Sequence, residues 1–571
     1  MKLIYGITAL CALLASCKSK TSDESSVLAD SAAIASGEAI FKQDCSACHS
    51  FDRDAIGPRL GGVTASAPGE WIMNFVSDPK KMIESGDERA NKLYDRFKTI
   101  MPSFTHYDNE KRQQIFAFLK SNENVAKAEI TDDPNALKDP IPEKIAMSDL
   151  VAELKLVSSI PFSSEEKPRT RIVKLEIQPG TNKLFALDLR GKIYDISGSE
   201  PVVYFDMTPN RPAFIHKPGL ATGFGSVAFH PEFVSNGLMY TTHTEPAGTQ
   251  AADFAYADSI PVTLQWVLTE WKAANPGQST FSGGGRELLR INMVTGMHGV
   301  QEICFNPYAK RGSKDYGLLY VGVGDGACVE YNFPELVRHQ LLWGSIIRID
   351  PKGNNSKNGK YGIPADNPFA HEQSPEVYAF GFRNPHHITW LKSGVMLASN
   401  IGQHEIESYS IIRNGGDYGW PIREGSFLHN ERGNINVVYP LPADDASFNI
   451  TYPVIQYDHD EGNAMSDGFE YLGSAVPLLK GKFLYGDILR GRLFFSDVKE
   501  IVPGKQAAIH EWQVSIDGKI STMEQLCGEK RVDMRVGRDA RGELYVFTKP
   551  DGKIYQIVGA HMISSSPIAA Q

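Results

Sequence analysis

Cys45-Ser46-Ala47-Cys48-His49 is the most informative stretch of this 571-residue sequence. The C-x-x-C-H spacing is typical of c-type haem attachment, because each of the two thiols can bond one vinyl group of a porphyrin while the next residue, a histidine, ligates the iron. A zinc site would need a second pair of ligands, and none follows nearby. A thioredoxin-like pair would not need the histidine. We therefore predict haem on Cys45 and Cys48, with His49 as an iron ligand.

A second iron ligand is expected downstream of this motif. Met101, which is followed by Pro102, is the candidate. A thioether ligand raises the potential of a haem, which suits an electron acceptor. Met73 and Met82 are alternatives that more simply fill gaps in a core.

The residues around the motif support the same interpretation. A glycine-rich turn at 57–62 and apolar-faced helices expected at 71–75 and 112–119 follow it. In this order, the motif, the turn, the Met-Pro pair and the last helix resemble class I mono-haem cytochrome c. The resemblance covers residues 35–122 and implies a small all-α domain.

The N-terminus predicts export from the cytoplasm. Lys2 precedes an apolar run that ends at Leu14, and small residues lead to Cys17. This is the pattern of a signal peptide. Residues 14–17 also resemble the lipobox of bacterial lipoproteins, in which Cys17 is acylated, and an ordinary signal peptide is the alternative. We expect a signal at 1–17, a flexible tether at 18–34, and a lipid-anchored protein of the periplasm or cell envelope, with the outer membrane favoured.

Composition narrows the possible functions. The formal charge of −10 argues against nucleic-acid binding, which needs a basic surface. No later apolar run is long enough to span a membrane. Three of the seven cysteines, Cys304, Cys328 and Cys527, belong to neither the signal nor the haem motif. Cys304 and Cys328 could form a disulfide in an oxidising compartment, or all three could be buried thiols.

The long C-terminal part has the texture of a β protein. Residues 123–165 suggest a linker with one short helix, and short β-rich runs separated by Gly, Pro and Asp then occupy 166–560, before a tail at 561–571. Lys-Ile-Tyr follows a glycine-centred turn in both the first and the last unit, at 192–194 and 553–555. Such repetition predicts a closed β-propeller, with a β-sandwich array as the alternative.

An ordered set of motifs adds a family resemblance. These motifs are Ala228–Phe233, Gly324-Asp325-Gly326, Leu342–Pro351, Ile363–Phe369, Gly381–Pro385, Ser399–Gln403 and Gly415–Pro421. In this order they resemble the soluble quinoprotein glucose/sorbosone dehydrogenase family. That family consists of six-bladed propellers that use pyrroloquinoline quinone (PQQ) and calcium.

The resemblance implies roles for particular residues. His298 falls where the family has its catalytic base, a task that histidine suits. Arg383 and Asn384 match the family's Arg-Asn pair that stacks on and hydrogen-bonds PQQ. Gly402 and Gln403 match two backbone carbonyls that bind calcium, although the family usually has proline at the second position.

Other implied roles are less closely matched. The negative charges of PQQ call for several cations, and Arg490, Arg531 and Arg535 are the available ones, with ordinary surface arginines as the alternative. His386 and His387 replace small or polar residues of the family and could line the pocket or serve structure.

These observations predict a quinohaemoprotein dehydrogenase. A sugar or related alcohol would pass hydride to PQQ, and electrons would move within the chain to the haem and on to a soluble cytochrome or respiratory acceptor. The alternative is a propeller without cofactor that binds a carbohydrate or protein, its cytochrome serving another enzyme. Ala221, where the family has a glutamine, favours that alternative.

Overall fold

The computed structural model describes residues 30–563 except 46–48, 53, 55–56, 98–100, 102, 127–132, 166, 218–220 and 339–340. The chain divides into two compact units, residues 1–127 and 128–571. The predicted signal, Cys17 and Cys48 lie outside the described residues.

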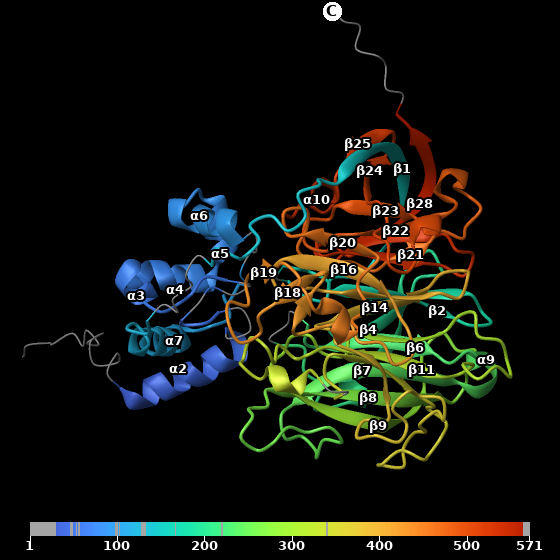
Figure 1. Cartoon of the computed structure of the whole chain (residues 1–571), viewed down its shortest axis with the longest axis horizontal. Coiled ribbons are helices and arrows are strands. Elements are labelled where there is room, and N and C mark those ends of the chain that lie inside the picture. Colours follow the sequence, from blue (N-terminus) through green and yellow to red (C-terminus); the bar gives the residue numbers. More distant parts are fainter. Residues whose placement is uncertain are drawn as a thin grey trace, which may run out of the picture. The chain divides into compact units, whose positions relative to one another are not determined.

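The first unit is helical, as the sequence predicted. Its helices are α2 (Ser31–Asp44), α3 (Val63–Ser66), α4 (Gly69–Ser77), α5 (Pro79–Glu84), α6 (Glu88–Phe97) and α7 (Asn109–Ser121) (Figure 1). The side chain of Asp108 caps α7 by accepting a hydrogen bond from the Lys111 amide. Helices α2 and α7 pack closely because Gly37 lacks a side chain, and a Cβ there would overlap the Gln114 carbonyl.

The second unit consists of six antiparallel blades. In chain order they are β2–β5 (Ile172–Gln178, Lys183–Asp188, Lys192–Asp195, Val202–Asp206); β6–β9 (Phe224–Phe229, Leu238–Pro246, Leu264–Ala273, Gly283–Met293); β10–β13 (Glu302–Phe305, Leu319–Val323, Ser345–Ile349, Val377–Phe380); β14, β15, β16 and β20 (Pro385–Trp390, Met396–Asn400, Ile406–Ile411, Ile455–Asp458); β21–β24 (Phe469–Glu470, Lys482–Gly486, Leu493–Asp497, His510–Ile516); and β26–β28 (Met534–Arg538, Leu544–Thr548, Lys553–Met562) with β1 (Ala146–Ser159).

Shorter elements connect or flank the strands of these blades. They are the helices α8 (Met207–Asn210), α9 (Phe233–Asn236) and α10 (Met523–Cys527), the strand β25 (Lys519–Ser521), and a small sheet of β17 (Arg423–Glu424), β18 (Phe427–His429) and β19 (Val438–Tyr439).

The first strands of the blades form a closed ring. Each of β2, β6, β10, β14, β21 and β26 contacts the next, and β26 contacts β2. This arrangement is a six-bladed β-propeller, and it confirms the predicted fold class. The two Lys-Ile-Tyr runs occupy equivalent third strands, β4 and β28.

Strand β1 closes the ring. It pairs antiparallel with β28 and parallel with β24, the outer strand of the preceding blade. The short helix expected before Leu156 was therefore a wrong prediction. Its apolar residues can serve either a helix or a strand, and pairing with two strands from the far end of the chain decides between them.

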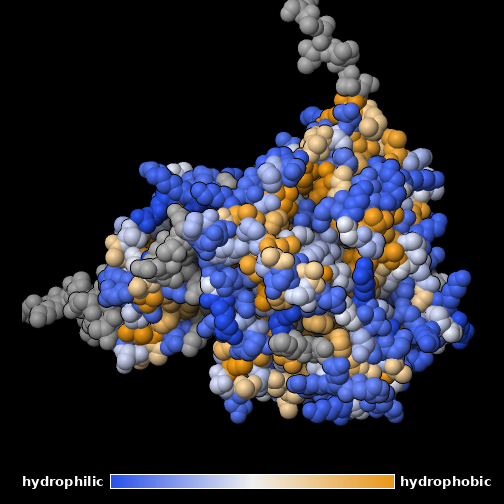
Figure 2. Space-filling model, viewed as in Figure 1, coloured by the Kyte–Doolittle hydropathy of each residue, from blue (hydrophilic) through white to orange (hydrophobic). Residues whose placement is uncertain are grey.

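The next expectations from the sequence concern membrane spans and the three remaining cysteines. Within the described part of the chain, no helix is long and apolar enough to cross a membrane. Figure 2 shows a largely hydrophilic face, with apolar residues near the C-terminal strands, where Ile520 and Met562 are exposed. Cys304, Cys328 and Cys527 are unpaired thiols, and burial raises the pKa of each.

Leu154→Ala tests the closure by β1. The Leu154 side chain is 2% exposed in the core of the last blades, whereas Leu156 on the same strand is 44% exposed. We expect Leu154→Ala to lower the free energy of unfolding by about 2–5 kcal/mol. The control, Leu156→Ala, should cost less than about 0.5 kcal/mol. Calorimetry measures both, and equal effects would contradict a buried β1.

Candidate active site

The predicted haem ligand His49 sits in a tight backbone cradle. Its Nδ1 lies 2.8 Å from the Pro58 carbonyl oxygen, so Nδ1 carries the proton and Nε2 is the nitrogen suited to a metal. A Cβ on Gly57 would lie 2.9 Å from Nδ1 and closer still to Cε1. The imidazole is thus fixed by a hydrogen bond on one edge and by backbone against its face, an arrangement that fits a haem ligand.

The other predicted haem residues lie in the same unit. Cys45 ends α2, and its amide donates to the Phe41 carbonyl at 2.9 Å. Cys45 and Met101 both pack against the hydrophobic core of this unit, which includes Ile72 and Phe104. The structure therefore places Cys45, His49 and Met101 in one small helical body, and their roles stay predictions.

The predicted residues of the second unit gather at one end of the propeller. His298 precedes the inner strand β10, and Arg383 and Asn384 precede the inner strand β14. Gly402 lies between β15 and β16, the second and third strands of its blade. In an up-and-down blade, the loop before the first strand and the loop between the second and third strands meet at the same end. We call this end the mouth.

His298 is held by a buried carboxylate. Its Nδ1 lies 2.9 Å from Oδ1 of Asp325, and Asp325 also accepts hydrogen bonds from the Ala327 amide and from Nε1 of Trp420. Because Asp325 acts as an acceptor throughout, Nδ1 of His298 is the donor and Nε2 is left as a base. The backbone of His298 has a φ of +47°, which is costly for a residue with a side chain.

Arg383 joins this pair to the loop at Gly402. Its carbonyl accepts from the Asp325 amide at 2.8 Å, and Nη1 donates to the Gly402 carbonyl at 2.5 Å. Nη2 pairs with Glu330 at 2.6 Å, while Nε is buried without a partner among the described residues. Asn384 Nδ2 lies 3.4 Å from Oε1 of Gln301.

At the predicted calcium site, Glu424 fixes the loop, but the Arg383 guanidinium occupies one of the two predicted calcium-binding carbonyls. Oε1 of Glu424 accepts four backbone N–H groups, from residues 403–406, and so fixes the loop. The Gly402 carbonyl, however, faces the Arg383 guanidinium, whose positive charge opposes a calcium ion there. Nor do three or more His, Cys, Asp or Glu side chains of the described ranges form a metal-binding group. As arranged, these residues do not fit calcium.

One side of the mouth gathers several buried cations. Arg535 is 3% exposed, and its Nε and Nη1 are buried without partners among the described residues. Burial lowers the pKa of Lys549 to about 7; Asp533 opposes this shift, and neighbouring arginines at 535, 171 and 531 add to it. Unsatisfied donors and repelling cations both favour an anion, so this side of the mouth fits a polycarboxylate such as PQQ.

The other two predicted arginines are engaged within the protein. Arg490 donates to the Asn463 side chain and to the carbonyls of Asp460 and His459, at 2.7–3.0 Å. It therefore braces the loop between β20 and β21, which connects the preceding blade to its own. Arg531 pairs with Asp533 at 3.1 Å. Both assignments to PQQ stay predictions.

Sequence reasoning did not assign roles to Asp325 or Lys549. Asp325 stands between two glycines at a strand end, a context that marks a functional turn. Lys549 follows strand β27 at a Lys-Pro-Asp-Gly turn, where nothing in the sequence reveals its burial. The first could have been found from its local pattern, and the second could not.

Matches of the sequence to known protein families agree with this architecture. The model of the Glucose / Sorbosone dehydrogenase family matches residues 209–556, more than half of the chain. The chain belongs to the glucose/sorbosone dehydrogenase family. The Cytochrome c model matches residues 34–123, so this glucose/sorbosone dehydrogenase relative carries a cytochrome c region ahead of its propeller.

Individual relatives are distant. HIPL1 protein of Arabidopsis thaliana is 27% identical over 345 residues, which cover 52% of this chain and 46% of that protein. Quinoprotein glucose dehydrogenase B of Acinetobacter calcoaceticus is 31% identical over 83 residues, 14% of this chain and 16% of that one. The chain thus spans about half the length of the first curated relatives it matches.

One solved structure supports the fold. The soluble aldose sugar dehydrogenase of Escherichia coli in its apo form superposes with a TM-score of 0.52 at 16% identity, over 72% of this chain and 100% of that chain. At this identity, the likeness shows a shared propeller and no more.

Gly57→Ala tests the cradle of His49. The added methyl group would collide with the imidazole, so we expect the haem absorption spectrum to change and the midpoint potential to shift. Gly86→Ala is the control, because a Cβ there meets nothing within 4 Å, although its φ of +83° costs some stability. An unchanged haem spectrum in Gly57→Ala would contradict ligation by His49.

Proposed function

We propose that this protein is a PQQ-dependent dehydrogenase that oxidises a sugar or related alcohol and passes the electrons to its own c-type haem. The observation that carries the proposal is the His298–Asp325 pair, which lies beside Arg383 and Asn384 at the propeller mouth of a glucose/sorbosone dehydrogenase family member. The name of the quinoprotein relative and the cytochrome c region support the cofactor and the electron acceptor.

His298 acts as the general base. Asp325 holds Nδ1, so Nε2 is the nitrogen left to take the hydroxyl proton of the substrate. Trp420 and the Ala327 amide hold Asp325 in turn, which keeps the imidazole from rotating. The same carboxylate stabilises the imidazolium that results.

Arg383, Asn384 and Arg535 would hold PQQ, with Lys549 contributing positive charge. When bound, PQQ supplies the acceptor for the hydride of the substrate carbon. Because a haem accepts single electrons, the haem of this chain would take the two electrons of one turnover in two steps. A haem on the same polypeptide keeps its local concentration high.

The cellular setting is part of the same proposal. An acyl group on Cys17 would tether the protein to a bacterial membrane outside the cytoplasm, with the outer membrane favoured. A soluble cytochrome or a respiratory component would receive the electrons from the haem.

Reconstitution tests the proposal. Purified full-length protein is incubated with PQQ, with and without calcium, and the haem spectrum is followed while aldoses and alcohols are added. Haem reduction that requires PQQ is the expected result. Absence of PQQ binding together with an oxidised haem would refute the enzyme and favour a ligand-binding propeller, which the engagement of Arg490 by the loop between β20 and β21 also suits.

His298→Ala should abolish turnover and leave PQQ bound. Loss of a general base costs about 10²–10⁴-fold in rate, while Arg383, Asn384 and Arg535 remain to hold the cofactor. His371→Ala, at an exposed position, is the control and should react normally. Stopped-flow haem reduction measures the rate, and undiminished turnover in His298→Ala would remove that residue from its role.

Lys549 should make PQQ affinity depend on pH. Because burial and neighbouring cations hold its pKa at about 7, the lysine loses its charge as pH rises above that value. We expect PQQ to bind more weakly above pH 7 and to take up a proton on binding. Lys549→Arg stays charged and should abolish both effects, as titration calorimetry in buffers of different ionisation enthalpy would show. Equal pH dependence in the two proteins would contradict this role.

A further inference from the structure

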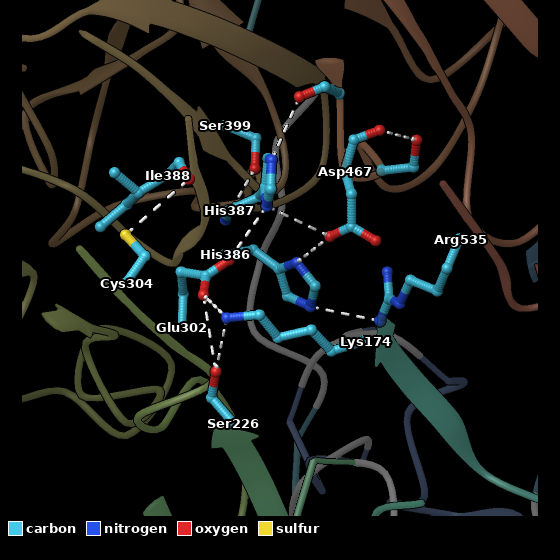
Figure 3. Close-up of polar contacts among 12 residues, drawn as sticks. Lys174, Ser226, Glu302, Cys304, His386, His387, Ile388, Ser399, Asp467 and Arg535 are labelled. Carbon is cyan, nitrogen blue, oxygen red and sulfur yellow. Dashed lines mark hydrogen bonds and ion pairs between the residues drawn. The ribbon is translucent and has the colours of Figure 1, made fainter. Parts of the chain in front are cut away.

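A cavity on the propeller axis contains titratable groups that the proposed chemistry does not use. Residues of all six inner strands, or next to them, line the cavity. We call the following set the axial network: His386, Asp467, His387, Glu302, Lys174 and Glu176. Figure 3 shows the first five converging from β2, β10, β14 and the residues just before β21.

A β-bulge explains how two consecutive histidines reach one cavity. Adjacent residues of a regular strand point to opposite faces. Strand β14 shifts register between Pro385 and His387, so His386 is an extra residue relative to β15. Both imidazoles consequently line the cavity, and both residues are more than nine-tenths buried.

The pair of His387 and Glu302 must hold a labile proton. Nε2 of His387 lies 3.1 Å from the Gly468 carbonyl, which can only accept, so Nε2 carries a hydrogen. Nδ1 lies 3.0 Å from Oε2 of Glu302. A neutral imidazole has one N–H, so the contact at Nδ1 needs a second proton, on the imidazole or on the carboxyl group.

Successive groups of the network lie within 4 Å of one another, although the two contacts to Asp467 are longer than hydrogen bonds. Nδ1 of His386 and Nδ1 of His387 lie 3.9 Å and 3.7 Å from the same oxygen, Oδ1 of Asp467. On the far side, Lys174 donates to Oε1 of Glu302 at 2.5 Å and pairs with Glu176 at 3.2 Å. The Glu176 side chain is 21% exposed, so the chain of groups reaches solvent.

Two atoms of the network have space to exchange a proton. Arg535 can only donate to Nε2 of His386, so Nδ1 carries the hydrogen of the neutral imidazole; Nδ1 and Oδ2 of Asp467 are buried and have no hydrogen-bond partner among the described residues. Burial raises the pKa of Asp467, against the effects of Arg535 and His387, and lowers the pKa of His386, with Arg535 and Lys549 adding to the shift. The carboxyl group therefore holds a proton more readily than an ordinary aspartate, and it lies beside an imidazole whose Nδ1 hydrogen it can receive.

One end of the network, at His386, contacts a residue of the mouth. Nε2 of His386 lies 3.2 Å from Nη2 of that residue, Arg535. Oxidation of one C–OH group to C=O releases two electrons and two protons. The haem takes only the electrons, so both protons must reach water.

We propose that the axial network is a proton path that carries protons from the mouth beside His298 along the propeller axis to solvent at Glu176. This inference rests on the proposed function. In this role the network residues take protons on from the mouth and are not the base that acts on the substrate.

Asp467→Asn tests the path, because the amide keeps the shape but cannot carry a proton. We expect turnover to fall at least about tenfold, with a larger solvent isotope effect, unchanged PQQ affinity and unchanged thermal stability. Imidazole or formate, as small diffusible proton carriers, should restore part of the rate. His387→Gln should behave alike, since glutamine can donate one hydrogen bond but holds no labile proton.

Glu376→Gln is the matched control. Glu376 is also a buried carboxyl group whose pKa burial raises and whose second oxygen lacks a partner among the described residues, but it lies beside the outer strand β13. Infrared difference spectra of the protein without substrate should show a protonated carboxyl band from Asp467 at mildly acidic pH. This band should disappear in Asp467→Asn. It should remain in Glu376→Gln, which should lose only the band of Glu376.

Three outcomes would overturn the inference. Asp467→Asn could turn over like Glu376→Gln, which refutes the path while the proposed function stands. A slowed variant that no carrier rescues would show a structural defect instead. Wild-type protein that binds no PQQ and oxidises no sugar would refute the proposed function and remove the source of the protons with it.

Discussion

The pairing of β1 with β28 and β24 is the constraint on which the propeller depends. A ring of blades cannot form by local contacts alone, because its last blade must be completed by a strand from elsewhere in the chain. Here residues 146–159 supply that strand, more than 350 positions before β24. Closure brings the first strands of all six blades around one axis, and the mouth and the axial cavity exist only because those strands converge.

Closure also places charges where they are costly. Arg383 and Arg535 are almost wholly buried with guanidinium nitrogens that lack partners among the described residues, and His298 adopts a left-handed backbone conformation. An isolated fold gains nothing from such features, since buried unpaired donors destabilise it. They are explained by a ligand that supplies the missing acceptors. The opposite holds at Gly402, whose carbonyl already has a cationic donor.

Sequence reasoning succeeded where chemistry depends on residues that are close in the chain. The spacing of Cys45, Cys48 and His49 identified the cytochrome region, and repeated strand–turn–strand units identified the propeller. It failed where distant pairing decides: the apolar residues near Leu154 suit a helix as well as a strand. Arg490 was predicted from the family resemblance and the need for cations, but only the structure shows that its donors are used by the loop between β20 and β21. Burial of Lys549 likewise arises from tertiary packing alone.

The bulge at His386 makes the lining of the axis sensitive to residue count more than to residue type. Substituting either histidine would change one side chain and leave the strand in register. Removing one residue between Pro385 and Ile388 would restore the regular ladder with β15 and turn the remaining histidine to a single face of the blade. Among propellers built on this plan, the length of that strand, and not its composition, would then distinguish an axis with two imidazoles from one with a single imidazole.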